Sequence, residues 1–197
     1  MKTILTGLTV VLFIGVVASC RQPPAKEDAA AAESRWMEKG QELATAAFTA
    51  LSGELRAALG RGGVPEAIQY CHVAALPITD SIAAGYDATI RRTTLKPRNP
   101  ANAPRGHETD VLAGYQAASD QGQALQPQVH VEGNQVHFYA PIMTQDMCLK
   151  CHGNPGETIA EKDWALIQER YPNDLAHGYG AGEWRGMWSI AFEKERD

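Results

Sequence analysis

Residues 128–142 read QVHVEGNQVHFYAPI, and this stretch decides the fold class. Apolar and polar side chains alternate on both sides of the segment 132–135, EGNQ, which is typical of two antiparallel strands joined by a tight turn. Residues 88–95 and 184–192 also have strand patterns, whereas much of the rest shows helical periods. Because strands and helices mix without regular βαβ units, the sequence predicts an α+β domain, with an antiparallel sheet carrying helices on one side.

A long N-terminal helix is expected before the sheet. Apolar residues recur every three or four positions over 33–59, and glycines at 60, 62 and 63 supply a stop. A second helix should begin at Pro65 and end before Gly85. Pro77 lies inside that second helix and is expected to kink or divide it. The apolar face of the N-terminal helix suits a homodimer and its own domain equally well, so both remain open.

Two more helices and one loop complete the prediction. The helical period returns over residues 107–120. Thr158 and Glu161 have the spacing of a capping box for a helix that reaches about Tyr171. Residues 96–104, KPRNPANAP, contain three prolines and are expected to form a structured loop.

Composition limits the function classes. The chain has 197 residues, of which 44% are hydrophobic and 21% charged, as expected for one globular domain. Lys and Arg number 18 against 23 Asp and Glu, so the net charge is -5 and a nucleic-acid partner is excluded. Four cysteines are too few for a disulfide scaffold of this length, so each needs its own explanation.

The first segment has the features of an export signal. Residues 1–19 hold one lysine followed by an apolar run too short to span a membrane comfortably. Val17-Ala18-Ser19-Cys20 resembles the bacterial lipobox, which predicts a lipoprotein signal peptide and a lipid on Cys20; an uncleaved anchor is the alternative. Residues 20–34 should then be a tether, followed by a domain over 35–197. The expected location is the periplasm, on a membrane; Arg21 in place of Asp favours the outer membrane by analogy.

The chemistry is concentrated at Cys148-Leu149-Lys150-Cys151-His152. C-x-x-C-H is the attachment signature of c-type haem, in which both thiols form thioethers and the histidine ligates iron. A thioredoxin-like dithiol belongs near the start of a domain, and a zinc site needs a second ligand pair that the sequence lacks. A disulfide between Cys148 and Cys151 would be strained. The motif therefore predicts one covalent haem c, with His152 as an iron ligand.

Cys71 is left as an odd thiol in an exported protein. It is expected to be either a buried small hydrophobic residue or the second axial ligand of iron, opposite His152. His72 is the nearest competitor for that role, and Met143 and Met147, just before the haem motif, are weaker ones.

Four segments occur in the order found in one known family. They are 67–71 (AIQYC), 91–104 (RRTTLKPRNPANAP), 148–152 (CLKCH) and 179–190. With them the chain resembles the bacterial single-haem c-type cytochrome family with a PAS-like haem domain, long catalogued as a domain of unknown function. The resemblance covers roughly residues 33–192. It implies a five-stranded PAS-like sheet with the haem held against its helices, and iron ligation by His152 and Cys71.

A basic segment stands out in this acidic chain. Arg91, Arg92, Lys96 and Arg98 form either a solvated strand edge and loop or a set of contacts to the haem propionates, which a guanidinium can bind with two hydrogen bonds.

These features support one function and leave two alternatives. The first is a lipid-anchored haem protein that transfers electrons or senses redox state or a gas such as CO or NO, with an unidentified redox or signalling partner. The second is a haem enzyme, a peroxidase or small-oxide reductase with an open iron site, in which His72 or Arg92 serves the distal side. The third is a PAS-like module that binds a small organic molecule.

Overall fold

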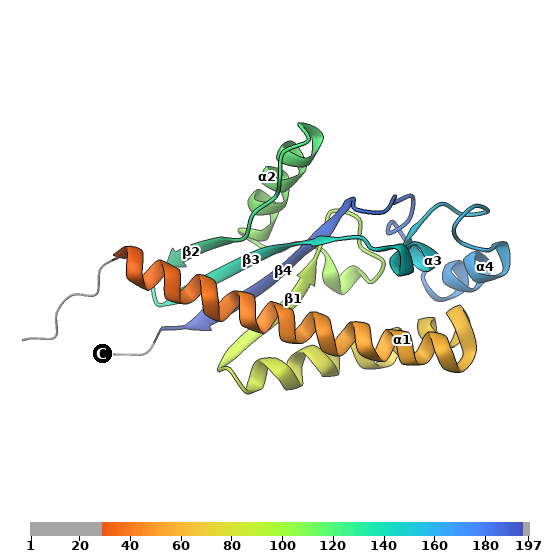
Figure 1. Ribbon diagram of the computed structural model, residues 1–197, viewed down its shortest axis with the longest axis horizontal. Helices are drawn as coiled ribbons and strands as arrows, with labels where there is room; N and C mark the ends of the chain where they lie inside the picture. Colours follow the sequence, from red (N-terminus) through yellow and green to blue (C-terminus); the bar gives the residue numbers. More distant parts are fainter. Residues whose placement is uncertain (1–28, 195–197) are drawn as a thin grey trace, which may run out of the picture.

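The computed structural model describes residues 29–194, without the side chains of residues 72–76. The signal peptide, Cys20 and residues 20–28 of the expected tether lie outside the described residues, as does the side chain of His72. Within the described part, a long helical hairpin lies along a twisted antiparallel sheet (Figure 1). The α+β class predicted from the sequence is confirmed.

The sheet has four strands in the order β1-β4-β3-β2. They are β1 (Ala88–Thr93), β2 (Gln128–Glu132), β3 (Gln135–Met143) and β4 (Trp184–Glu193), and every neighbouring pair is antiparallel. β2 and β3 form the predicted hairpin, with Gly133 at positive φ in its turn. The family resemblance implied five strands, whereas the sheet of the described residues has four.

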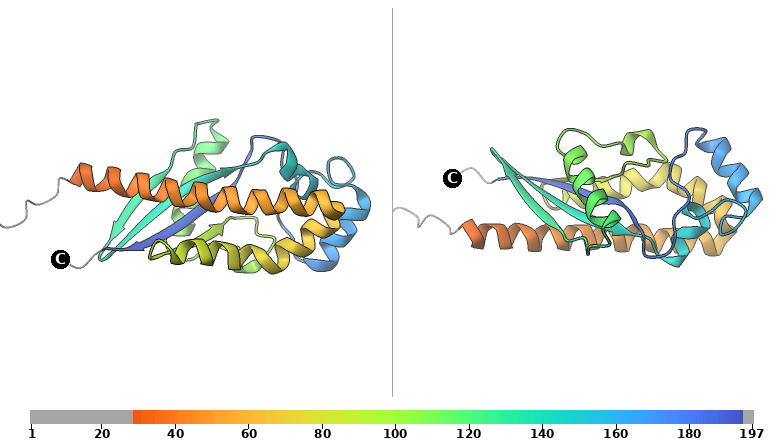
Figure 2. Two further views of the ribbon diagram at one scale, coloured as in Figure 1. Left: turned by 60° about the horizontal axis from the view of Figure 1, so that its bottom comes forward. Right: turned by 90° about the horizontal axis from the view of Figure 1, so that it is seen from above.

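Helix α1 (Ala29–Ala84) contains both predicted N-terminal helices. Its backbone leaves helical geometry at Gly62 and Gly63, where Gly63 has a φ of 70°, and the chain reverses direction there. Figure 2 shows the two arms side by side. The expected division at Pro77 is wrong, because the helix continues to Ala84 and its last turn packs against the sheet core. The last six residues of the expected tether, 29–34, also belong to this helix.

Both faces of the sheet are covered, so the expectation of helices on one side is wrong. On one face, the first arm of α1 packs Leu43 and Ala47 against Phe138 and Ile190. On the other face lies α2 (Glu108–Asp120), whose Leu112 and its neighbours contact Tyr139 and Met187 of the sheet. The sheet can be sandwiched because its strands alternate apolar side chains to both sides near β4.

A third apolar cluster joins the hairpin turn to the C-terminal half of the chain. It contains Val64 and Ile68 of α1 together with Ile159 and Ile167. The short helices η2 (Asp146–Cys148) and α3 (Leu149–His152) lie at this end, beside α4 (Glu161–Arg170). A further short helix, η1 (Pro100–Asn102), lies in the predicted proline-rich loop.

The predicted capping box of α4 is wrong. Ala160 occupies the N-cap and makes no side-chain capping bond. The hydroxyl of Thr158 instead accepts a hydrogen bond from the Asn154 amide at 2.8 Å, so this side chain closes the preceding loop.

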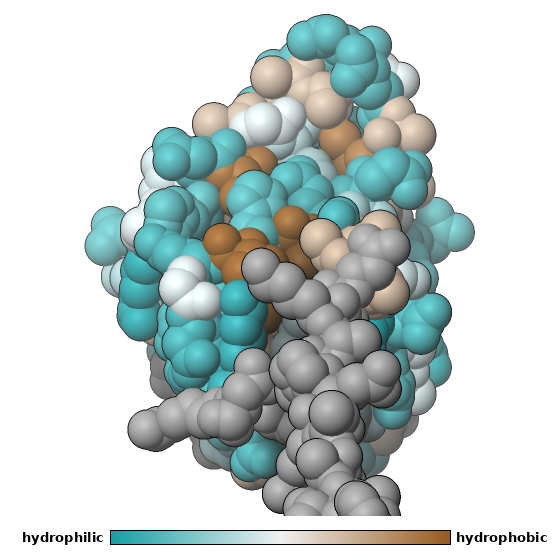
Figure 3. All heavy atoms as spheres, turned by 90° about the vertical axis from the view of Figure 1, so that its left-hand side faces the viewer, coloured by the Kyte–Doolittle hydropathy of each residue, from teal (hydrophilic) through white to brown (hydrophobic). Residues whose placement is uncertain are grey.

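Two surface properties complete the description. No helix of the described residues is long and apolar enough to cross a membrane. The end of the molecule where α1 begins has a mostly hydrophilic surface with separate apolar patches (Figure 3).

Candidate functional site

The two cysteines of the C-x-x-C-H motif lie on one continuous short helical stretch. η2 ends at Cys148 and α3 carries Cys151 and His152. Both thiols are free and half-buried. The Cys148 sulfur accepts a hydrogen bond from the Gln145 amide at 3.4 Å, which fixes the start of the motif. The pair is therefore available to form two thioethers.

His152 is held by a carbonyl from a distant loop. Its Nδ1 lies 2.7 Å from the carbonyl oxygen of Ala176. Because a carbonyl only accepts, Nδ1 carries the proton and Nε2 keeps its lone pair. Burial lowers the pKa of His152 well below its usual value, and the charges of Arg98 and Arg185 lower it further. A neutral imidazole with a free Nε2 is the form that ligates a metal.

Arg98 joins α3 to the loop that carries Ala176. Its Nη2 donates to the carbonyl oxygen of Cys151 at 2.5 Å and to that of Ala176 at 3.3 Å. Its Nε and Nη2 donate to the same carboxylate oxygen of Asp174, at 3.1 and 2.9 Å. The carboxylate that Arg98 binds in this structure is thus Asp174, rather than one supplied by a ligand.

Arg91 and Arg92 are adjacent in β1 and lie on opposite faces of the sheet. Arg91 donates to Glu108 at 2.6 Å and to the carbonyl oxygens of Ala101 and Ala103, so it ties the loop after β1 to the start of α2. Arg92 is paired in register with Trp188, which belongs to the core cluster under α1. Only Arg92 of this pair is therefore on the face where the second arm of α1 carries Cys71.

Cys71 is exposed on that second arm. Burial as an ordinary core residue, one of the two expectations for it, is therefore wrong. The thiol interacts electrostatically with Arg92 and Arg98, and also with the Cys151 thiol of the haem motif. The fold thus brings Cys71 towards the C-x-x-C-H motif, 77 residues before Cys148 in the chain.

Arg185 was not among the predicted site residues. Its Nη1 donates to Thr94 at 2.9 Å, and its guanidinium lies 5.2 Å from the ring centre of Tyr179. Its Nε is buried without a hydrogen-bond partner in the described structure, and burial lowers the pKa of the guanidinium. An arginine near the start of an otherwise apolar strand was the sequence signal that could have found it.

Two further predicted residues, Lys96 and Met143, are exposed. Lys96 is exposed, with its ammonium 5.4 Å from the ring centre of Tyr179. Met143 is 43% exposed at the end of β3.

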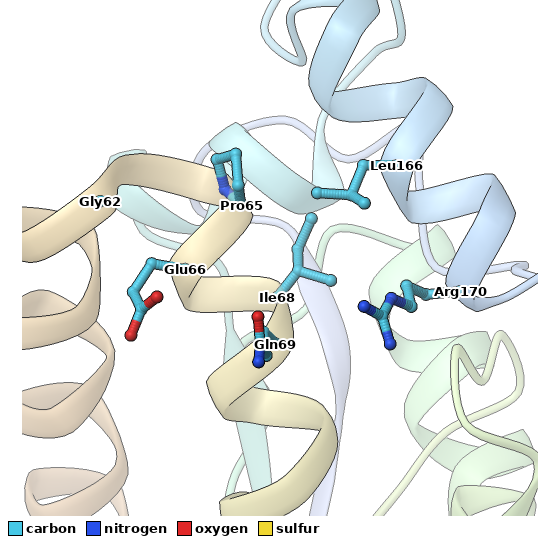
Figure 4. A pocket seen from close by; sticks show the side chains of 7 residues that line it. All are labelled: Gly62, Pro65, Glu66, Ile68, Gln69, Leu166 and Arg170. Atoms are coloured by element: carbon cyan, nitrogen blue, oxygen red, sulfur yellow. The ribbon is translucent and has the colours of Figure 1, made fainter.

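A separate cavity of about 250 Å³ lies between the second arm of α1 and α4 (Figure 4). Apolar contacts from Pro65, Ile68 and Leu166 line it, with Arg170 at one side. Neither the two motif cysteines nor His152 line this cavity, so it is distinct from the C-x-x-C-H site.

Comparison with known proteins shows the family of this chain. The sequence model of the family described as Tll0287-like matches residues 21–192. Among solved structures, the crystal structure of the cyanobacterial heme-protein Tll0287 is similar, with 27% sequence identity and a TM-score of 0.58. The match covers 83% of this chain and 96% of that chain. No curated protein matches the chain. The family match spans far more than half of the sequence, and it confirms the family resemblance read from the motifs: the chain belongs to the Tll0287-like family.

Proposed function

We propose that this chain binds one haem covalently, through thioethers from Cys148 and Cys151, with His152 and Cys71 as the axial ligands of iron. The observation that carries the proposal is the hydrogen bond from His152 Nδ1 to Ala176, because it leaves a neutral Nε2 beside two free thiols. The similarity to a structure described as a heme-protein supports the same cofactor.

The cationic side chains around the motif fit the charges of such a group. Burial lowers the pKa of Arg92, which interacts electrostatically with Cys71, and Arg185 has a buried Nε without a hydrogen-bond partner among the described residues. A buried guanidinium N–H without an acceptor is costly, which favours an anionic group beside Arg185. We assign Arg92 and Arg185 to the haem propionates, with Lys96 at the exposed edge. Arg91 and Arg98, also predicted for this role, are engaged with Glu108 and Asp174.

Whether Cys71 coordinates iron determines which reactions the site can support. A bound haem iron supplies a one-electron couple. A Cys71 thiolate would stabilise the ferric state and leave no open coordination position, which favours electron transfer or redox sensing over turnover of a substrate. Release of Cys71 on reduction would open a position for CO or NO. Without iron, desolvation by the surrounding protein raises the pKa of the Cys71 thiol, and the charges of Arg92 and Arg98 offset this rise only in part, so coordination to iron would have to supply the preference for the thiolate.

The predicted export signal supports a location outside the cytoplasm. We infer that the protein is a lipoprotein, anchored through Cys20 and facing the periplasm, where haem is attached to C-x-x-C-H motifs. Metabolic labelling with a radioactive fatty acid tests this: the wild type should be labelled and Cys20→Ser should not. Label retained by Cys20→Ser would contradict the assignment.

The central experiment compares ferric and ferrous spectra of the holoprotein with those of Cys71→Ala, both expressed with haem-attachment machinery. The wild type should give a low-spin ferric thiolate signal in electron paramagnetic resonance, and the variant should lose it. His72→Ala is the matched control and should keep the signal. A signal unchanged in Cys71→Ala would exclude Cys71 as ligand. A high-spin, five-coordinate wild type that turns over peroxide would favour the haem enzyme.

A further inference from the structure

We propose that Arg98 and Asp174 are positioning residues for His152, and that they adjust the iron reduction potential in opposite directions. This inference rests on the proposed ligation of iron by His152. Neither side chain touches the predicted cofactor in this proposal; both act through the Ala176 carbonyl and through their charge.

The geometry makes Arg98 the link between two elements. The imidazole of His152 belongs to α3, whereas its acceptor, Ala176, belongs to the loop after α4. The guanidinium of Arg98 donates to the Cys151 carbonyl on the first element and to the Ala176 carbonyl on the second. Arg98, whose side chain is 14% exposed, therefore helps to hold His152 and its acceptor at a fixed distance.

Asp174 holds Ala176 through its backbone amide, whereas Arg98 holds its carbonyl. One of its carboxylate oxygens accepts two hydrogen bonds from Arg98, and the other accepts one from the Ala176 amide at 2.8 Å. Its side chain is only 2% exposed. A carboxylate this deeply buried is tolerated because it is paired with Arg98 and both of its oxygens accept hydrogen bonds. The Ala176 residue is thus held at its amide by Asp174 and at its carbonyl by Arg98.

The hydrogen bonds to the Ala176 oxygen and the charges of Arg98 and Asp174 also affect how strongly the His152 imidazole donates electron density. The Ala176 oxygen accepts from both His152 and Arg98, so the two donors compete for it. Without the cation, the oxygen would accept from His152 alone and Asp174 would be an uncompensated buried anion. Both changes make the imidazole a stronger donor and favour ferric iron, which lowers the potential. Removing the Asp174 charge instead leaves Arg98 uncompensated and raises the potential.

The chain contains a matched control pair. Arg91 and Glu108 also form a buried ion pair, at 2.6 Å, and Arg91 also donates to two backbone carbonyls. That pair lies on the α2 side of the sheet and does not contact α3 or the Ala176 loop. Loss of either ion pair should lower the free energy of unfolding. Only loss of the Arg98–Asp174 pair should change the surroundings of His152 and hence the reduction potential.

The test is potentiometric titration of holoprotein variants, with electron paramagnetic resonance of the ferric state. Relative to wild type, Arg98→Gln should lower the potential, Asp174→Asn should raise it, and Arg98→Lys, which keeps the charge, should lower it less than Arg98→Gln. Arg91→Lys should lose stability without a change in potential or spectrum. Unchanged potentials, or shifts of the same sign in Arg98→Gln and Asp174→Asn, would overturn the proposal.

Two outcomes separate this inference from the function on which it rests. If Arg98→Gln does not load haem, the directions of the potential shifts in Arg98→Lys and Asp174→Asn test the proposal by themselves. Wild-type protein without covalent haem, or with a ferric spectrum that His152→Ala leaves unaltered, would overturn the proposed function itself. Wild-type protein with His152 ligation and potentials insensitive to both residues would overturn only the role of the pair.

Discussion

His152 and Ala176, separated by 24 residues, are joined by a hydrogen bond of 2.7 Å from the imidazole Nδ1 to the backbone carbonyl. The motif that is expected to hold the cofactor is therefore completed by a loop from another part of the chain. Two backbone bonds strengthen the same junction, from the Gly178 amide to Gly153 and from the Tyr179 amide to His152. Positioning of His152 is a property of this loop junction rather than of the short helix alone.

The two motif thiols should contribute separately to attachment. Cys148→Ser and Cys151→Ser should each retain haem through a single thioether, and the pyridine haemochrome band should shift in the direction expected for one unreacted vinyl group. The double variant should release its haem into acidified acetone. Cys71→Ser is the control, with an unshifted haemochrome band. Covalent haem in the double variant would refute the assignment of both thiols.

The neighbours Arg91 and Arg92 should behave differently because they face opposite sides of the sheet. Arg92→Gln should lower the reduction potential, since it removes a buried cation from the side of Cys71. Arg91→Gln should leave the potential unchanged and lower the free energy of unfolding by about 3 kcal/mol, because it leaves Glu108 buried and unpaired. Redox titration and urea denaturation of both holoproteins measure the two effects. Equal shifts in reduction potential in the two variants would contradict these different roles of Arg91 and Arg92.

Two glycines of α1 should respond with opposite signs to substitution by alanine. A Cβ at Gly40 would overlap the ring of Phe138, where the first arm of α1 lies on β3, so Gly40→Ala should lower the free energy of unfolding by about 1–3 kcal/mol. Gly53 is exposed and has nothing within 4 Å of the added atom. Gly53→Ala should raise the free energy of unfolding by about 0.5–1 kcal/mol through helix propensity. Denaturant titration measures both changes in the free energy of unfolding. A stabilised Gly40→Ala would contradict the close packing of Gly40 on Phe138.

Alkaline pH should destabilise the fold between about pH 10 and 12. Burial raises the pKa of both Tyr115 and Tyr139 from 10.0 to about 12. The unfolded chain then loses these protons first, so stability is fully present below pH 10 and falls as pH rises through the folded pKa. The free energy of unfolding of the holoprotein, measured by circular dichroism in denaturant across this range, should show the decline. Tyr139→Phe should make it shallower, and an identical slope would contradict the assignment.

Local patterns account for much of what could be predicted. Alternation over residues 128–142 identified the hairpin, and the glycines at 62 and 63 identified the break inside α1, because both signals act through backbone geometry within a few residues. Predictions that depended on packing were less successful. Pro77 does not divide its helix, and Thr158 bonds within the loop before α4 rather than capping that helix.

The sequence by itself determined the α+β class and the C-x-x-C-H motif, since strand period and motif spacing are written in consecutive residues. Only the tertiary structure decided which partner each arginine takes. Arg98 binds Asp174, 76 residues later, and Arg92 lies on the side of Cys71 because alternation along β1 sends it there and Arg91 away. Charge partners are chosen by proximity in space, and that proximity arises only when the hydrophobic packing of distant segments has fixed the fold.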